Sequence, residues 1–264
     1  YGFQWGVLGA ALATLLSRVF CTAVVFYCLR KPKQTIVVRD YLKIRPDIPL
    51  IVAIMAIGVP SGIENGMFQF GKLAVQSTVS TMGTVAMSAQ AMTNIFENVN
   101  GIFGNSVGIG LMTIVGQCIG ANRREEAKYY IVKLMGIAMV GTFVSCFLVL
   151  VITKPVTWLA GMEPKAAQMC FELVAVMTVI KPLVWVGAFG LPYGLRAAGD
   201  VKFSMIASVS IMWGCRVALG IFLVKVFHFG LVAVWIGMFA DWIVRAVVFT
   251  ARFVNGKWLY YKMS

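Results

Sequence analysis

The sequence has few of the residues from which metal centres and nucleophilic active sites are built. It contains a single histidine, His228, and its six cysteines form no CxxC pair. Zinc sites and Ser-His or Cys-His catalytic groups each require several such residues. We therefore expect no metal site, no cofactor and no enzyme activity, and we expect the cysteines to be free thiols within apolar stretches.

Charged residues are also scarce, and long apolar runs separate them. Charged residues make up 12% of the chain and hydrophobic residues 60%, with a mean hydropathy of +0.85. A helix needs about 20 mainly apolar residues to cross the hydrocarbon core of a bilayer. Seven stretches are this long, near residues 3–29, 48–80, 84–117, 129–153, 166–194, 203–227 and 230–253. The sequence thus predicts an all-α, polytopic membrane helix bundle with seven transmembrane helices.

The charges that remain are unevenly distributed, and this indicates an orientation. Lys and Arg gather in the gaps after the first, third and fifth stretches and in the tail. Basic residues near the ends of spans stay preferentially in the cytoplasm. We predict that residues 30–47, 118–128 and 195–202 and the C-terminus are cytoplasmic, in a multi-pass protein of the plasma (inner) membrane. The net charge of +13 then reflects topology, and nucleic-acid binding is not expected because the charges are scattered over short loops.

This orientation places Tyr1 on the outer side, although no basic leader or cleavage site precedes the first stretch. The expectation is that further helices precede it and that the chain is the later part of a longer protein. A weak internal repeat agrees, since repeated halves are common in transporters. The first and last stretches match at Gly6, Gly9, Ala13 and Ser17 against Gly230, Ala233, Gly237 and Asp241.

The second and third stretches carry polar side chains that lipid would not accept, because a charge at the bilayer centre costs roughly 3 kcal/mol. These side chains must face a bundle interior or a watery cavity. Two cations in later stretches, Lys181 and Arg216, need a carboxylate, a carbonyl or water for the same reason. The candidates for ion or substrate binding are Glu64, Gln69, Lys72, Asn94, Glu97, Asn98, Lys181 and Arg216.

Glu64 lies one turn beyond Pro60, where a proline removes a backbone hydrogen bond and can bend the helix. It is either a proton or cation site whose protonation changes with access to the cavity, or half of a fixed ion pair with Lys72 or another buried cation.

The other polar groups leave similar alternatives. Glu97, with Asn94 and Asn98, is either a ligand site or a structural hydrogen-bond network. Asp241 and Arg245 are four residues apart with the acid first, which favours a structural ion pair.

Several motifs together resemble the multidrug and toxic compound extrusion (MATE) family. The resemblance runs from end to end, although each motif alone is weak. The motifs are Gly58-Val59-Pro60-Ser61-Gly62, the stretches 108–122 and 194–200, Trp213 with Arg216, and residues 230–245.

The resemblance implies a twelve-helix antiporter of two six-helix lobes, which exports organic cations or other amphipathic compounds in exchange for sodium ions or protons. Residues 1–29 would be the last helix of the N-terminal lobe, 30–47 a cytoplasmic inter-lobe linker, and 48–264 the C-terminal six-helix lobe. The chain would be a partial two-lobe fold, and the N-terminal lobe its missing partner.

The family's coupling residues match only in part. Some members have a coupling glutamate in the seventh helix, and Glu64 lies in that helix about one turn nearer the proline. Those members have an acidic residue in the tenth helix, where this chain has Lys181 within the span and Glu172 near its outer end. Other members couple through an aspartate in the first helix, which lies outside this chain. The coupling ion therefore stays open between sodium and the proton.

Two other functions are considered. A lipid-linked saccharide or lipid flippase of the same superfamily is favoured if Lys72, Lys181 and Arg216 line a basic cavity. A seven-helix receptor or retinal protein suits the span count. However, the last stretch lacks a lysine for a retinal Schiff base, and the outer gaps lack a cysteine pair.

Overall fold

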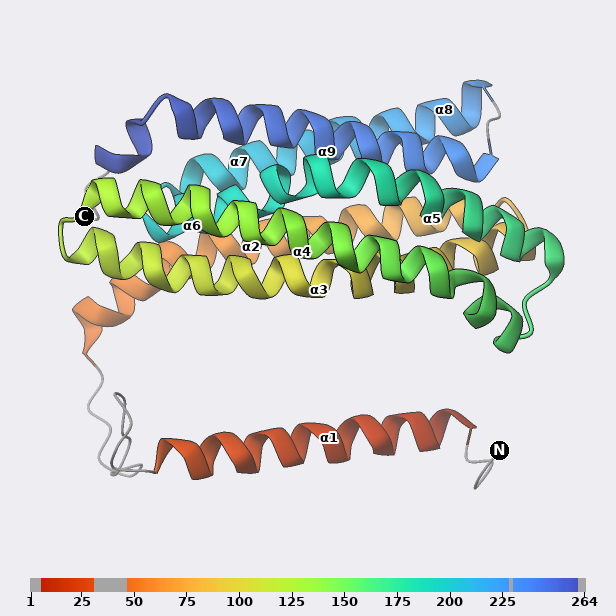
Figure 1. Cartoon of the computed structure of the whole chain (residues 1–264), viewed down its shortest axis with the longest axis horizontal. Coiled ribbons are helices and arrows are strands. Elements are labelled where there is room, and N and C mark those ends of the chain that lie inside the picture. Colours follow the sequence, from red (N-terminus) through yellow and green to blue (C-terminus); the bar gives the residue numbers. More distant parts are fainter. Residues whose placement is uncertain (1–5, 31–46, 228–229, 261–264) are drawn as a thin grey trace. The chain divides into compact units, whose positions relative to one another are not determined.

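The computed structural model describes residues 6–30, 47–227 and 230–260, and every regular element in these ranges is helical. Seven helical segments are long and apolar enough to cross a membrane, which confirms the predicted number of spans (Figure 1). The first four lie in α1 (Gly6–Leu29), α2 (Ile48–Ser80), α3 (Thr84–Gly120) and α4 (Arg124–Leu159).

The last three spans include two composite helices. The fifth runs through α5 (Pro164–Trp185), the π-helical segment η1 (Val186–Gly190) and α6 (Leu191–Ala197). The sixth runs through α7 (Val201–Ile211), the π-helical segment η2 (Met212–Leu219) and α8 (Gly220–Phe227), and the seventh is α9 (Gly230–Val254). A short 3-10 helix, η3 (Lys257–Tyr260), follows.

The chain separates into two compact units, Tyr1–Ile51 and Val52–Ser264. The first contains α1, an apolar helix whose cysteines, Cys21 and Cys28, are exposed in that unit. Residues 31–46 of the predicted linker lie outside the described residues. The second unit contains nearly all of the predicted C-terminal lobe and all of the candidate residues.

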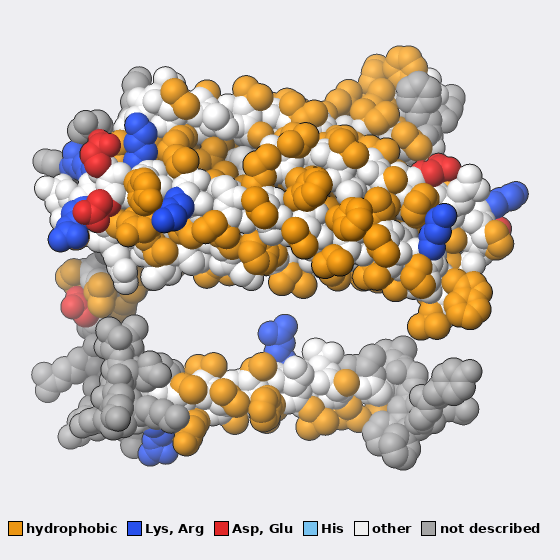
Figure 2. All heavy atoms as spheres, viewed as in Figure 1, with side chains coloured by type: hydrophobic (Ala, Val, Ile, Leu, Met, Phe, Trp, Pro, Cys, Tyr) orange, Lys and Arg blue, Asp and Glu red, His pale blue; other side chains and the backbone are white. Residues whose placement is uncertain are grey.

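In the second unit α3, α4 and α5 pack against one another, while α9 packs against α8 and both π-helical segments. Two hydrophobic clusters hold these helices together. The larger includes Met177, Trp235 and Trp242, and the smaller includes Leu111 and Phe249. Figure 2 shows hydrophobic side chains over most of the visible surface of this bundle and charged side chains near its ends, as expected for a bundle embedded in lipid.

Prolines and glycines set the local geometry of the fifth span. Pro182 and Pro192 lack an N–H group and flank η1, where the backbone widens into a π-turn. Two glycines of α3 leave room for large side chains of this span. A Cβ atom at Gly104 would meet the ring of Trp185, and one at Gly108 would meet the ring of Tyr193. The close approach fixes how α3 sits against the fifth span.

Candidate functional site

The second unit contains a cavity of about 440 Å³ between α2, α3 and η2, here called the large cavity. Six of the eight candidate residues line it, although they come from three separate segments. The lining residues of α2 recur every three or four residues, and so do those of α3, so each set lies on one face of its helix. The lining consists of Gln69, Lys72, Leu73, Val75, Gln76, Gln90, Asn94, Glu97, Asn98 and Arg216.

Lys181 lies directly behind the wall of the large cavity, with its side chain fully buried. Its ammonium group donates to the Glu97 backbone carbonyl at 2.6 Å and to Glu97 Oε1 at 3.1 Å. The same nitrogen lies 5.2 Å from the ring centroid of Trp185 and 5.9 Å from that of Trp242. The Lys181 ammonium therefore contacts both a carboxylate and a carbonyl, the partners expected for a cation within a membrane span. It also neutralises the charge of Glu97.

Lys72 and Arg216 line the large cavity without such a partner. Within the described residues, neither has a carboxylate at ion-pair distance. Both lie instead against the ring of Phe68, with Lys72 Nζ at 5.1 Å and Arg216 Cζ at 5.6 Å from its centroid. Cation–π contact holds a charge in place but does not neutralise it.

A second cavity of about 150 Å³, here called the small cavity, lies beside an earlier part of α2. Phe68 lines the small cavity, and its ring also contacts the two cations of the large one. The lining residues are Glu64, Asn65, Phe68, Asn105, Ala188, Phe189, Pro192, Tyr193, Arg196, Ser208 and Arg245.

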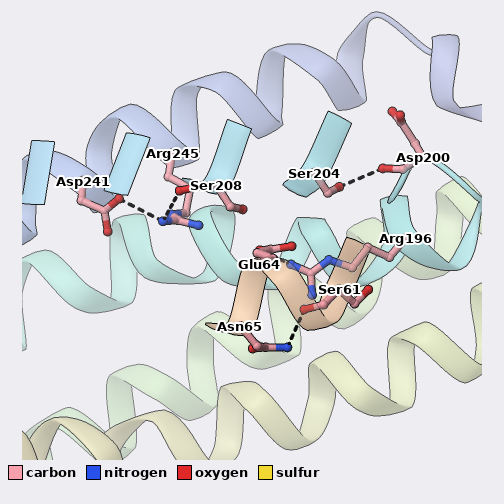
Figure 3. Close-up of polar contacts among 9 residues, drawn as sticks. All are labelled: Ser61, Glu64, Asn65, Arg196, Asp200, Ser204, Ser208, Asp241 and Arg245. Atoms are coloured by element: carbon pink, nitrogen blue, oxygen red, sulfur yellow. Dashed lines mark hydrogen bonds and ion pairs between the residues drawn. The ribbon is translucent and has the colours of Figure 1, made fainter. Parts of the chain in front are cut away.

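Glu64 pairs across the small cavity with Arg196 of α6, and Figure 3 shows the two side chains pointing toward each other. Arg196 Nη2 donates to Glu64 Oε1 at 2.6 Å, and the side chains are 19% and 11% exposed. The cation that contacts Glu64 is therefore Arg196 and not Lys72. Lys72 lies two turns further along α2 at the large cavity, whereas the long side chain of Arg196 reaches Glu64 from α6.

Asp241 and Arg245 of α9 form an ion pair at 3.0 Å, as their spacing predicts. Arg245 also donates to the Ser208 carbonyl at 3.2 Å (Figure 3). Its guanidinium carbon lies 5.0 Å from the Phe189 ring centroid. The two charged side chains are at most 2% exposed, so this pair is buried more deeply than the Glu64–Arg196 pair.

The small cavity contains polar atoms that lack a hydrogen-bond partner among the described residues. They are Glu64 Oε2, Arg196 Nε, Ser208 Oγ and Arg245 Nε. Buried groups of this kind normally bind a partner or ordered water. Glu64 Oε2 is thus available to a small cation, a proton or water, and the Arg196 Nε–H group is available to water or another acceptor.

Arg196 is the main residue that sequence reasoning missed. It was counted among the basic residues of a cytoplasmic gap, whereas the helix continues through α6 to Ala197 and carries Arg196 into the bundle. The available signal was its place in the family-like stretch 194–200. In the described part of the chain, no group of three or more His, Cys, Asp or Glu residues is arranged to hold a metal ion.

Comparison with known families and relatives agrees with this architecture. A family model described as MatE matches residues 60–222. The probable multidrug resistance protein NorM of Thermotoga maritima is 25% identical over 264 residues, covering 98% of this chain and 55% of that protein. The probable multidrug resistance protein YoeA of Bacillus subtilis is 26% identical over 242 residues, covering 90% and 52%. The chain thus spans about half the length of the curated relatives it matches.

Solved structures show the same fold. The crystal structure of MATE in complex with MaL6 superposes with a TM-score of 0.81 at 18% identity, covering 97% of this chain and 58% of that one. A MOP superfamily transporter from Pyrococcus furiosus, for which reverse polarity of the binding pocket suggests a different function, gives a TM-score of 0.66 at 20% identity, covering 80% and 45%.

Proposed function

We propose that this chain, which belongs to the MatE family, is part of a secondary active transporter that exports small molecules in exchange for sodium ions or protons. Members of this family are transporters and not enzymes, and the family assignment confirms the resemblance found in the sequence. The activity, the coupling ion and the substrate of the complete protein are the parts that we propose.

The proposed arrangement follows the two-lobe plan. Residues 1–29 are the last helix of the first lobe, residues 30–47 the linker, and residues 48–264 the second lobe. The C-terminus is cytoplasmic. The cavities of the second unit then form one wall of a pathway whose other wall is the first lobe, and the ion and the substrate each favour one of two access states.

The observation that carries the coupling proposal is the Glu64–Arg196 pair. The carboxylate lies beside a cavity and is mostly buried, and its Oε1 contacts Arg196 while its Oε2 has no hydrogen-bond partner among the described residues. A sodium ion or proton that binds Glu64 competes with Arg196 for the same charge. Since Glu64 is on α2 and Arg196 on α6, ion binding weakens a contact between two helices of the lobe and so favours one arrangement over another.

Two substrate classes compete. The names of the relatives favour drug-like compounds, including organic cations. The charge of the large cavity favours the second candidate, a lipid-linked saccharide or lipid flippase, because Lys72 and Arg216 line it and Lys181 lies directly behind Glu97.

The coupling proposal is tested in proteoliposomes that contain the complete protein under an imposed sodium or proton gradient. Efflux is measured for two probes, the organic cation ethidium and the anion glucose 6-phosphate. We expect Glu64→Gln to lower gradient-driven efflux at least about tenfold, because the amide keeps the shape of the side chain but cannot change charge. Glu172→Gln, at an exposed position of α5, is the matched control and should retain efflux.

Gradient-driven efflux at the wild-type rate in Glu64→Gln would remove Glu64 from the coupling step. Absence of gradient-driven efflux of both probes from the unmodified protein would contradict the transport proposal itself.

A further inference from the structure

The lining of the large cavity is unusual for a site that takes lipophilic compounds. Small-molecule pockets are mainly lined by hydrophobic and aromatic side chains. Here only Leu73 and Val75 are apolar, and the other eight lining residues are amides or charged groups. The volume of about 440 Å³ lies within the range of roughly 300–1,000 Å³ that is typical of ligand sites. The cavity is therefore large enough for a ligand, and its lining offers polar groups that can bind a hydrophilic one.

The charges of this cavity do not cancel. Glu97 is the only acidic residue in its lining, and the buried ammonium of Lys181 contacts both its carboxylate and its backbone carbonyl. Glu97 is thus already neutralised by a group that lies outside the cavity. Lys72 and Arg216 remain, and neither has a carboxylate at ion-pair distance among the described residues, so the lining carries an excess of positive charge. An organic cation would meet repulsion here, whereas an anion would be attracted.

The geometry of the two cations supports binding rather than chance proximity. Both lie against the same ring, that of Phe68, so the two positive groups are neighbours in the lining. A guanidinium donates in a fixed planar fork that fits carboxylate and phosphate, and an ammonium adds a second point charge. The amides of Gln69, Gln76 and Asn98 are exposed near them and offer both donors and acceptors, which suits hydroxyl groups.

We propose that the large cavity binds the anionic, hydroxyl-rich part of the substrate, a phosphate or carboxylate group attached to a sugar-like unit. Lys72 and Arg216 bind the anion and the amides bind the hydroxyl groups. This inference rests on the proposed transport function and names its substrate class. The same chemistry occurs in a soluble sugar phosphate and in the headgroup of a lipid, and the experiment separates these two sources.

Binding is measured on the complete protein without any ion gradient. One arm uses equilibrium dialysis of radiolabelled glucose 6-phosphate against the protein in detergent. The other arm uses thermal stabilisation in nanodiscs that contain phosphatidylinositol, compared with nanodiscs of phosphatidylcholine alone. The variants are Lys72→Met, Arg216→Gln, Arg216→Lys and Lys72→Glu. Lys225→Met, which removes an exposed cation of α8 outside both cavities, is the matched control.

We expect saturable binding in at least one arm, and we expect Lys72→Met and Arg216→Gln each to weaken it about tenfold, the effect of losing one hydrogen bond to a charged group. Arg216→Lys should retain part of the binding, and Lys225→Met should bind as the unmodified protein does. Lys72→Glu should abolish phosphate binding and increase the affinity for tetraphenylphosphonium. Lys72 is exposed, so its variants test the site even if the Arg216 variants fold poorly.

The inference is overturned if neither phosphate probe binds saturably, or if Lys72→Met and Lys225→Met bind it equally well. It is also overturned if tetraphenylphosphonium binds the unmodified protein more tightly than Lys72→Glu. These results would leave Glu64-dependent efflux untouched. Conversely, failure of gradient-driven efflux would leave the binding result standing, so the two proposals fail separately.

Discussion

The two cavities of the second unit are both lined by α2 and α3 but balance their charges in different ways. At the small cavity each charged group has a partner, Glu64 with Arg196 and Arg245 with Asp241. At the large cavity the Lys181 ammonium neutralises Glu97, and the two lining cations have no carboxylate at ion-pair distance within the described residues. A balanced site is suited to exchanging one small ion for another, whereas a site with excess charge is suited to a charged substrate.

The helix α2 borders both cavities and gives each a different charge. Glu64 lines the small cavity and Lys72, two turns further along, lines the large one, with Phe68 between them. Few residues of α2 are buried; in its described part they are Glu64, Gly71, Val75 and Val79. Because α2 contacts the rest of the unit along a narrow stripe, a change at Glu64 can shift the helix and alter the position of Lys72. Ion binding and substrate binding would then be coupled through one element.

The largest expected effect on stability tests whether Lys181 neutralises Glu97, the acid of the large cavity. Glu97→Gln leaves the fully buried Lys181 without a counter-charge, and we expect a loss of about 3 kcal/mol in the free energy of unfolding. Lys181→Met should cost less, about 1 kcal/mol, because the remaining Glu97 carboxylate is 21% exposed and can be hydrated from the cavity. The measurement is unfolding of the complete protein in detergent by increasing SDS.

The double variant Glu97→Gln with Lys181→Met should be close to the unmodified protein in stability, since replacing both members of a buried pair is often nearly neutral. A larger loss for Lys181→Met than for Glu97→Gln would show that Glu97 depends on Lys181 and not the reverse. That order would contradict the interpretation of Lys181 as a buried cation that needs Glu97 as its counter-charge.

A smaller effect is expected from the packing that places Trp185 beside Lys181. A Cβ atom at Gly104 would meet the Trp185 ring, which is buried and stacked on Phe189, so the ring has little freedom to move. We expect Gly104→Ala to lower the free energy of unfolding by about 1–2 kcal/mol. Gly110→Ala is the matched control on the same helix, because nothing lies within 4 Å of its Cβ position, and it should be neutral or slightly stabilising.

This prediction is measured with the same SDS titration. Equal stability of Gly104→Ala and Gly110→Ala would mean that Trp185 is not held by α3. The burial of Lys181 would then need another explanation.

Much of this architecture could be predicted from the sequence, for physical reasons that act locally. A span must be long and apolar, so the seven helices follow from composition alone. Polar groups within a span must avoid lipid, so Gln69, Lys72 and Asn98 were candidates before their common cavity was known. Asp241 and Arg245 are one turn apart, and their pairing needs only the geometry of a single helix.

The partners that come from different helices could not be predicted in this way. Glu97 and Lys181 are 84 positions apart, and Glu64 and Arg196 are 132 apart. Which residues meet depends on how α3 fits against Trp185 and Tyr193, and on the widened backbone of η1 and η2. A π-turn changes the face on which later residues lie, so a period of 3.6 residues no longer gives the direction of Arg216. Because the partner of Glu64 comes from another helix, Lys72, which is close to Glu64 in sequence, did not predict it.

The smallest expected effect on stability is at the Glu64–Arg196 pair, and it separates a coupling role from a structural one. Both side chains are partly exposed beside the small cavity, so the pair should contribute only about 1 kcal/mol to the free energy of unfolding, as polar contacts between membrane helices commonly do. A double-mutant cycle with Glu64→Gln, Arg196→Met and the combined variant measures this energy in the SDS titration. Gradient-driven efflux is measured on the same proteins.

If Glu64 binds the coupling ion, the combined Glu64→Gln and Arg196→Met variant should regain stability but not efflux, because no carboxylate remains to bind the ion. Glu64→Gln with Lys72→Met is the control and should regain neither, since Lys72 is not the partner of Glu64. Recovery of efflux in the combined Glu64→Gln and Arg196→Met variant would assign the pair a purely structural role.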